Sequence, residues 1–270
     1  MAPNIEILFS TILLGLLLLL AQAYICRFSI LEGALWGIVI GSTAGLIVPL
    51  EMHALSLSGR LWSLSLGVMT ILGFWVCVIL LRFYRDPERE PPQGANLIVS
   101  PADGRVIYVK KVQRGKVPVS IKGGQEFELA ELTQTDMIER PSWLIGIEMS
   151  ILNVHVNRAP THGKVVMQKL IKGDFISLKR PDAVMRNSRV TTVIESERLR
   201  VAIIQIASRL VRVITSYVRQ GDELTLGQRI GMIKFGSQVD VVVPKMEDLR
   251  ILVKVGERVK AGISVLATYE

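Results

Sequence analysis

The sequence predicts N-terminal transmembrane helices followed by a mostly-β (α+β) soluble domain. Three long apolar runs lie near the N-terminus, and short β-branched segments separated by glycine and charged turns follow a proline-rich link. Charge divides the chain at the same place. Two basic and three acidic residues precede Arg82 and give a net charge of −1, whereas thirty basic and twenty-one acidic residues from Arg82 onward give +9. We therefore expect a membrane anchor over residues 1–82 and a basic domain over residues 83–270.

The apolar runs extend over Ile7–Cys26, Gly33–Leu50 and Leu61–Leu81, which are 20, 18 and 21 residues long. A helix rises 1.5 Å per residue, so each run crosses or nearly crosses a hydrocarbon core of about 30 Å. The second run is short and rich in glycine, and a re-entrant hairpin is its alternative, which leaves two or three transmembrane helices. A cleavable signal peptide is the alternative for the first run, but no basic residue precedes that run and further apolar runs follow it.

Arginines mark the side of the membrane on which the domain is expected. Arg82, Arg85 and Arg89 directly follow the third run, and the positive-inside rule then predicts a domain on the cytoplasmic side of the cell's inner membrane. The basic domain suits an anionic phospholipid surface, where each Lys or Arg contributes about 1 kcal/mol. Nucleic acid is not an expected partner, because the charges are scattered, aromatic residues are few and the domain is tethered to a bilayer.

The proline-containing segment Tyr84–Asn96 is the expected domain boundary. Beyond it, long stretches of helical periodicity are scarce. Strands are expected at Val106–Val112, Trp143–Leu152, Lys164–Leu170, Arg189–Glu195, Leu199–Ile206, Arg229–Ile233 and Val239–Val243.

The dipeptide Gly236-Ser237 is a candidate site of backbone self-cleavage. The Ser237 hydroxyl can attack the unhindered Gly236 carbonyl, and elimination from the resulting ester would convert Ser237 first to dehydroalanine and then to a pyruvoyl group. That ketone can form a Schiff base with an amine and accept the electrons of a breaking carbon–carboxylate bond. Most Gly-Ser pairs are ordinary turns, so this interpretation depends on the rest of the chain.

Two further motifs supply groups that such cleavage needs. Ser100-Pro-Ala-Asp-Gly104 places Asp103 in a tight turn ahead of a strand, and Asn153-Val-His-Val-Asn-Arg-Ala-Pro160 places His155 between two valines. Each has a purely structural alternative, an aspartate serving its own turn and a buried histidine. Together with Ser237 they match the roles of a serine hydrolase triad: hydroxyl nucleophile, imidazole base and orienting carboxylate.

These motifs resemble the phosphatidylserine decarboxylase family, in particular its short branch. The resemblance covers nearly the whole soluble domain and is carried, in the family's order, by Phe83–Arg89, Ser100–Gly104, Asn153–Pro160, Lys172–Phe175, Gly231–Asp240 and Val255–Gly262. It implies a proenzyme that cuts itself between Gly236 and Ser237. The products would be a large subunit and a small subunit, residues 237–270, whose first residue carries the covalent pyruvoyl cofactor derived from Ser237.

The resemblance also implies an activity, that of a lyase of phospholipid biosynthesis. The enzyme would decarboxylate phosphatidylserine, an anionic seryl phospholipid, to phosphatidylethanolamine, and an ether-linked archaeal counterpart would undergo the same headgroup chemistry. Asp103 and His155 would be the processing residues, and His155 would also assist decarboxylation. No metal is expected, because a pyruvoyl group supplies the electron sink. The sequence leaves the oligomeric state open, a homo-oligomer included.

Four positions depart from the family's patterns. A better-known bacterial branch has a second histidine where this chain has Arg158, so His155 would serve both stages. Short-branch members usually have glutamate at the position of Ser188, and they differ from this chain at Ser208 and Val213 as well. These departures bear on substrate contacts and leave the cleavage motif intact.

Two alternatives to an active decarboxylase remain at this stage. Val241–Asp248 followed by Val255–Gly262 is similar to half of a biotinyl or lipoyl carrier hairpin, in which Lys245 would be the modified residue. Against this, Pro244 stands where a biotin carrier usually has methionine. The other alternative is a decarboxylase relative that has lost its activity.

Overall fold

A computed structural model describes most of the chain. The described residues are 3–25, 30–94, 96–112, 116–118, 126–128, 133, 141–174, 186–207, 213–234 and 237–270. They form two compact units, Met1–Leu81 and Arg82–Glu270.

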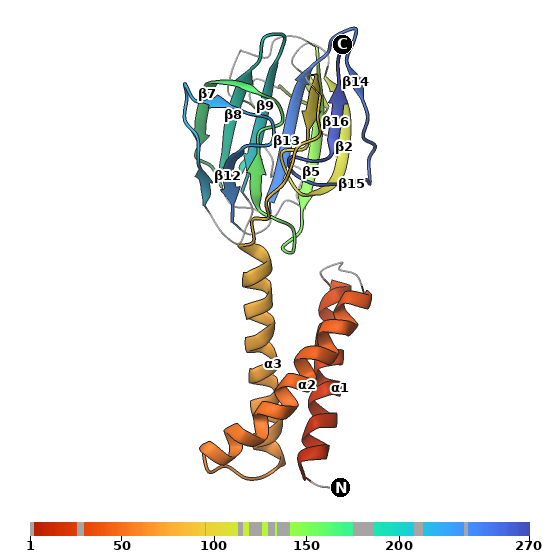
Figure 1. The fold of residues 1–270 in the computed structure, drawn as a ribbon, viewed down its shortest axis with the longest axis vertical. Coiled ribbons are helices and arrows are strands. Elements are labelled where there is room, and N and C mark those ends of the chain that lie inside the picture. The colour runs from red at the N-terminus through yellow and green to blue at the C-terminus, as the bar shows by residue number, and fades with distance from the viewer. Residues whose placement is uncertain are drawn as a thin grey trace. The chain divides into compact units, whose positions relative to one another are not determined.

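The first unit consists of the helices α1 (Pro3–Ile25), α2 (Ile30–Ala54) and most of α3 (Arg60–Phe83), shown in red to orange in Figure 1. All three are long and apolar enough to cross a membrane. The second apolar run belongs to one continuous helix of 25 residues, so the hairpin alternative for this run is wrong. Glycine lowers helix propensity in water, but here it has a packing role that outweighs this cost.

That role is the close approach of α1 and α2. Four glycines of α2 recur at every fourth position and therefore share one face of the helix; they are Gly33, Gly37, Gly41 and Gly45. A Cβ atom at Gly41 would lie 2.6 Å from the carbonyl oxygen of Thr11 and 2.7 Å from the Cα atom of Ile12. The backbones approach this closely only because the glycines carry no side chain, as in other small-residue interfaces between apolar helices.

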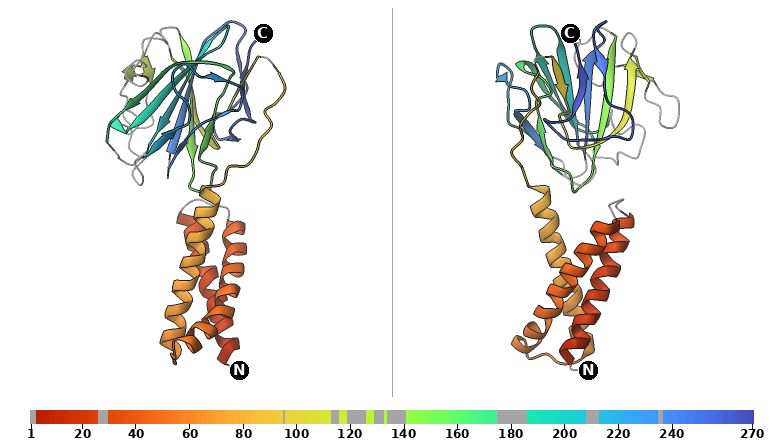
Figure 2. Two further views of the ribbon diagram at one scale, coloured as in Figure 1. Left: turned by 60° about the vertical axis from the view of Figure 1, so that its left-hand side comes forward. Right: turned by 45° about the vertical axis from the view of Figure 1, so that its right-hand side comes forward.

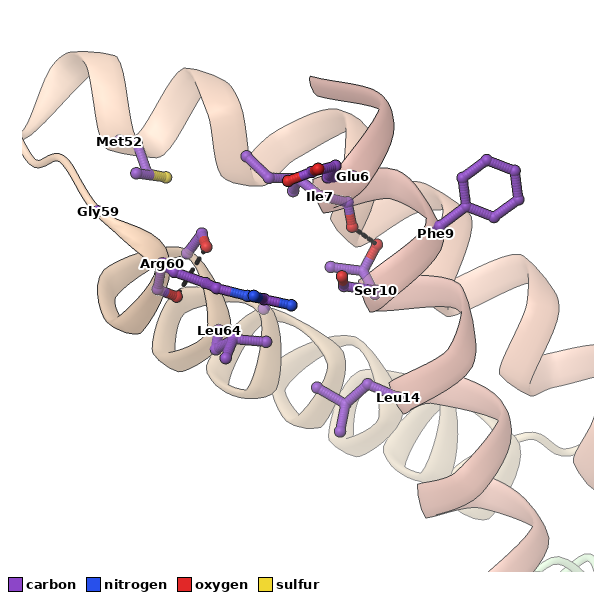
Figure 3. Close-up of a pocket in the computed structure, with 12 residues that line it drawn as sticks. Glu6, Ile7, Phe9, Ser10, Leu14, Met52, Gly59, Arg60 and Leu64 are labelled. Atoms are coloured by element: carbon purple, nitrogen blue, oxygen red, sulfur yellow. Dashed lines mark hydrogen bonds between the residues drawn. The ribbon is translucent and has the colours of Figure 1, made fainter. Parts of the chain in front are cut away.

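A cavity of about 510 Å³ lies within this unit, lined by residues of α1, the end of α2 and the beginning of α3. Figure 3 shows the Arg60 side chain extending from α3 toward α1, with Glu6 also in the lining. The residues that line this cavity all belong to the first unit, whereas the residues expected to carry the chemistry belong to the second.

The second unit is built mainly from antiparallel strands. In chain order they are β1 (Leu97–Val99), β2 (Gly104–Val112), β3 (Lys116–Pro118), β4 (Glu126–Glu128), β5 (Ser142–Met149), β6 (Val156–Arg158), β7 (Gly163–Ile171), β8 (Arg189–Glu195), β9 (Arg200–Ile206), β10 (Ile214–Ser216), β11 (Glu223–Leu224), β12 (Arg229–Ile233), β13 (Ser237–Pro244), β14 (Arg250–Ile251), β15 (Arg258–Val259) and β16 (Val265–Thr268). The expected mostly-β domain is thus confirmed.

Within the described residues, eight strands form one large sheet in the order β11-β7-β8-β9-β13-β5-β2-β15. The smaller sheets are β1-β16-β14, β10-β12-β6 and β3-β4. Figure 2 shows that the large sheet is curled. The central strand β13 pairs with β5 on one side and β9 on the other, so the segment that begins at Ser237 is held on both edges.

Each of the seven expected strands has an observed counterpart, and β8 and β12 match their expected bounds residue for residue. The expected strand Trp143–Leu152 is too long, because β5 ends at Met149. The Asn153 side-chain oxygen accepts a hydrogen bond from the Ser150 N–H at 2.7 Å and stabilises a turn there.

The main core lies between the large sheet and two of the smaller ones. It combines Val239, Val241 and Val243 of β13 with Ile98 of β1 and Leu266 of β16. Alternate residues of β13 lie on the opposite face, where Val242 belongs to a second apolar cluster. Both faces of the central strands are therefore buried.

The glycine contact between α1 and α2 can be tested by a single methyl group. Gly41→Ala should lower the thermal unfolding midpoint of the detergent-solubilised protein, because the added carbon overlaps the α1 backbone and overpacking costs about 1–3 kcal/mol. Gly73→Ala on α3 is the matched control, since no described atom lies within 4 Å of a Cβ built at Gly73. This control should unfold at or above the wild-type midpoint, because alanine is the better helix former. Equal midpoints for the two variants would contradict the close approach.

Candidate active site

Ser237 is the first residue of β13, and its backbone is paired with Met149 of β5. Gly236 and the Ser237 side chain lie outside the described residues, so the structure does not describe the expected cleavage bond itself. The preceding strand β12 ends at Ile233, whose backbone N–H donates a hydrogen bond to the His155 carbonyl at 3.2 Å. The expected cleavage segment thus connects two strands, and the end of one of them is bonded to His155.

His155 lies immediately before β6 and is fully buried. Its Nδ1 atom is 2.8 Å from the Asn153 carbonyl oxygen. A carbonyl only accepts hydrogen bonds, so this contact assigns the ring proton to Nδ1 and leaves the lone pair on Nε2. Nε2 is buried and has no hydrogen-bond partner among the described residues. The imidazole therefore presents an unused basic nitrogen inside the domain.

Burial also sets the charge of this ring. Desolvation lowers the pKa of His155 to about 4 and outweighs the Asn153 hydrogen bond and the Asp103 charge, which both raise it. The Phe83 ring contributes to the burial, with its centroid 4.1 Å from that of the imidazole. His155 is neutral near pH 7 and is able to act as a base.

Asp103 is anchored by three hydrogen bonds. Arg89 binds both carboxylate oxygens, with Nη1–Oδ1 at 2.5 Å and Nη2–Oδ2 at 2.9 Å, and the Ala261 N–H donates to Oδ1 at 2.8 Å. The charge of the carboxylate raises the pKa of His155, while the Nδ1–H of His155 donates to the Asn153 carbonyl. Asp103 therefore acts on the imidazole through its charge, and the two side chains have different hydrogen-bond partners.

The turn that carries Asp103 packs tightly on β5. The Ser100 hydroxyl donates to the Ala102 carbonyl at 2.7 Å within the turn. A Cβ atom at Gly104 would overlap the Glu148 carbonyl oxygen, so the Asp-Gly pair is required by a close backbone approach as well as by turn geometry.

Two buried amides connect the strands around the site. Gln205 Nε2 donates to Asn157 Oδ1 at 2.8 Å, and Asn157 Nδ2 donates to the Pro101 carbonyl at 3.3 Å. These two hydrogen bonds link β9, β6 and the turn that carries Asp103. Neither amide is among the predicted site residues. Asn157 lies within the motif Asn153–Pro160, and Gln205 is the one polar residue in the run Val201–Ile206.

A second buried polar cluster lies directly after Ser237 in the chain. Gln238 donates hydrogen bonds of 2.7 Å to the Tyr108 hydroxyl and to Asp240 Oδ1, and Tyr108 donates to Asp240 Oδ2 at 2.6 Å. Burial raises the pKa of Asp240 to about 6 and raises that of Tyr108 well above its ordinary value. This cluster, also missed from sequence, fixes the side chains of β13 that follow the expected cleavage point.

The positions that depart from the family's patterns have structural roles where they are described. Arg158 bonds to Asp86 and to the Pro87 carbonyl, at 3.1 and 3.0 Å. The Ser188 hydroxyl donates to the Gly173 carbonyl at 3.1 Å and accepts from the Gly173 N–H at 2.9 Å. Val213 is exposed, and Ser208 lies outside the described residues.

Lys245, the residue that a carrier would modify, directly follows β13. It is exposed, and its backbone N–H donates to the Pro141 carbonyl at 2.7 Å. It therefore lies at the opposite end of β13 from Ser237.

The residues present fit a carbonyl cofactor made from Ser237. The group would stand at the start of a strand hydrogen-bonded on both edges. His155 is bonded through its backbone carbonyl to the strand that leads into this segment. Its Nε2, which has no hydrogen-bond partner among the described residues, would be available for proton transfer.

Comparisons with known proteins agree on one family. A family model described as phosphatidylserine decarboxylase matches residues 78–267. Proteins named "Putative archaetidylserine decarboxylase proenzyme" from Methanothermobacter thermautotrophicus and Methanocaldococcus jannaschii are 38% and 39% identical, covering 74% and 71% of the chain and 84% and 92% of the relatives. A phosphatidylserine decarboxylase proenzyme from Syntrophus aciditrophicus is 36% identical, covering 76% of the chain and 93% of the relative.

The neutral state of His155 is open to direct measurement. The measurement is a pH titration by NMR of the Ser237→Ala variant labelled with ¹⁵N-histidine. We expect the ring nitrogens of His155 to keep the chemical shifts of a neutral imidazole from pH 8 down to about pH 5. The midpoint of the titration should lie near the pKa of about 4. The proton should reside on Nδ1. A midpoint at the ordinary histidine pKa of about 6.5, or a proton on Nε2, would show that the ring is neither buried nor oriented as described.

Proposed function

Because the chain belongs to the phosphatidylserine decarboxylase family, we propose that it converts phosphatidylserine to phosphatidylethanolamine by removing the carboxylate of the seryl headgroup. The observation that supports this most directly is the buried, neutral His155. Its Nε2 has no hydrogen-bond partner among the described residues, and its backbone carbonyl is bonded to the end of the strand that leads to Ser237. Nothing in the comparisons supports the carrier alternative with a modified Lys245.

In the proposed maturation step the Ser237 hydroxyl attacks the Gly236 carbonyl while Nε2 of His155 takes the hydroxyl proton. The peptide C–N bond breaks and an ester forms, and the amine of residue 237 receives the proton. The negative charge of Asp103 stabilises the imidazolium ion that forms in between, as a triad carboxylate does. Loss of the Cα proton of residue 237 and cleavage of its Cβ–O bond then release the large subunit as a carboxylate and leave dehydroalanine. Water hydrolyses the imine tautomer of this residue to the ketone and ammonia. The small subunit, residues 237–270, keeps the ketone.

In the proposed decarboxylation the ketone of the pyruvoyl group supplies an electron sink for the electrons left by the departing carbon dioxide. The substrate amine is protonated in water and must lose a proton before it reacts. Nε2 of His155, which is neutral at physiological pH, can accept that proton and later return it to the substrate carbon. One base thus serves both proton transfers. This agrees with the presence of Arg158 at the position where a better-known bacterial branch has a second histidine.

The proposed setting is the cytoplasmic side of the cell's inner membrane. Three helices are apolar enough to cross a membrane, and Arg82, Arg85 and Arg89 follow the third of them. The substrate would be drawn from the same bilayer, whose anionic headgroups attract the basic domain. The names of the relatives divide between archaetidylserine and phosphatidylserine. Assays of the purified protein with each of these two lipids would therefore determine which lipid backbone its substrate has.

Self-cleavage gives the first test of this function. The purified wild-type protein should migrate as two fragments, and the intact mass of the smaller should equal residues 237–270 with a pyruvoyl group in place of Ser237. Ser237→Ala should remain one full-length chain because it lacks the attacking hydroxyl. His155→Ala should be cut at least about 100-fold more slowly, because general-base assistance typically contributes that much.

His162→Ala is the matched control for the loss of an imidazole, since His162 is exposed, and it should be cut at the wild-type rate. Cleavage of Ser237→Ala at the same bond would rule out the acyl-shift mechanism. A wild-type chain that keeps its full mass would identify an inactive relative.

Trapping by reduction tests the second step. Borohydride added together with a seryl phospholipid should inactivate the enzyme and attach the lipid amine covalently to position 237 of the small subunit. The phosphatidyl and archaetidyl forms of the substrate should be compared at equal concentration in the same detergent. Labelling of the large subunit alone, with full loss of activity, would contradict a cofactor at residue 237.

A further inference from the structure

The last residue of α3 and the six residues that follow it are more than a connector. Residues 83–89, called the linker segment below, make hydrogen bonds and ring contacts with four separate parts of the second unit. Arg85 donates to the Leu152 carbonyl at 3.0 Å, and Asp86 binds the guanidinium groups of Arg158 and Arg229. A spacer needs none of these contacts, so the segment has a defined place in the domain.

The contact with Asp103 is the most specific of them. Arg89 reaches both carboxylate oxygens, and its Nη1 atom also donates to the Ala261 carbonyl at 2.7 Å. The two side chains are only 7% and 9% exposed. A bidentate pair in such a setting fixes the rotation of the carboxylate as well as its charge. Without the guanidinium, the buried Asp103 carboxylate would keep only the Ala261 N–H as a donor among the described residues.

The contact with His155 comes from the beginning of the same segment. Phe83 is fully buried and packs on the imidazole with a centroid separation of 4.1 Å and an interplanar angle of 35°. It belongs to a small apolar cluster with Val154, Val156 and Met232. Phe83 thus covers part of an imidazole that is itself fully buried.

The charged groups that act on His155 lie on other elements. Asp103, in the turn before β2, raises the pKa of the imidazole, and Arg85, in the linker segment, lowers it. Desolvation by burial has a larger effect on the pKa of the ring than either charge, and Phe83 is one of the side chains that bury the ring.

We propose that the linker segment completes the active site, with Arg89 positioning the carboxylate of Asp103 and Phe83 positioning and desolvating the imidazole of His155. This inference rests on the proposed function but assigns roles to two residues outside the predicted triad. Both are positioning residues, since they act through Asp103 and His155.

Titration tests the role of Phe83 without any need for cleavage. In the Ser237→Ala background, Phe83→Ala should raise the ¹⁵N titration midpoint of His155 by about one pH unit or more, because water reaches the ring. Phe83→Leu, which stays apolar, should keep the midpoint close to that of the parent. An unchanged midpoint in Phe83→Ala, with the fold intact by circular dichroism, would overturn the role of Phe83.

A double-mutant comparison tests the role of Arg89. Arg89→Gln should slow cleavage at least about tenfold, because the Asp103 carboxylate is no longer held in one orientation. Arg89→Lys should recover part of the rate, since lysine supplies the positive charge but not the two parallel N–H donors of the guanidinium. If Arg89 acts through Asp103, Arg89→Gln combined with Asp103→Asn should be no slower than Asp103→Asn alone. Additive losses would overturn this role.

Arg200→Gln is the matched control for a lost arginine. Arg200 pairs with Glu195 at 2.6 Å in an exposed position, and the variant should be cut at the wild-type rate. If the wild-type chain is not cut at all, the proposed function fails and the titration alone decides whether the linker segment controls His155. If the wild type is cut while Phe83→Ala and Arg89→Gln behave like it, the inference fails and the function stands.

Discussion

The burial of the His155 imidazole is the constraint on which the rest of the site depends. An unsatisfied buried nitrogen costs about 1–3 kcal/mol, and Nε2 is such an atom among the described residues. The same burial lowers the pKa of the ring to about 4, so the energetic cost of burial accompanies a ring that stays neutral at physiological pH. A neutral imidazole with a free lone pair is a base throughout the physiological pH range, and buried groups of this kind concentrate at functional sites.

The surrounding fold keeps this ring dry and oriented. The Asn153 carbonyl holds Nδ1, the Phe83 ring packs on the imidazole, and the Asn157–Gln205 pair links neighbouring strands. Asn157 and Gln205 come from different sheets, and they meet because β12, which pairs with β6, packs on the large sheet that contains β13. A rigid scaffold of this kind suits chemistry that must place a hydroxyl, a carbonyl and a base together.

The linker segment extends this arrangement to the part of the chain that follows the apolar helices. Buried ion pairs such as Arg89–Asp103 seldom add much stability, because desolvation offsets their attraction. Their value lies in orientation, and here the oriented group is a carboxylate whose charge acts on His155. The buried cluster of Gln238, Tyr108 and Asp240 has a similar role for β13, since it would hold the new end of the small subunit after cleavage.

The sequence by itself determined the features that local pattern encodes. Long uncharged runs specify the three helices, β-branched segments specify the seven longer strands, and the motifs around Asp103, His155 and Ser237 specify the family. Only the tertiary structure decided the strands of two to four residues, because hydrogen bonds to a neighbouring strand define them rather than any periodicity in the sequence. It also decided the partners of Asp103, which are 14 and 158 positions away in the chain. Contacts at such separations arise from packing, and no local pattern contains them.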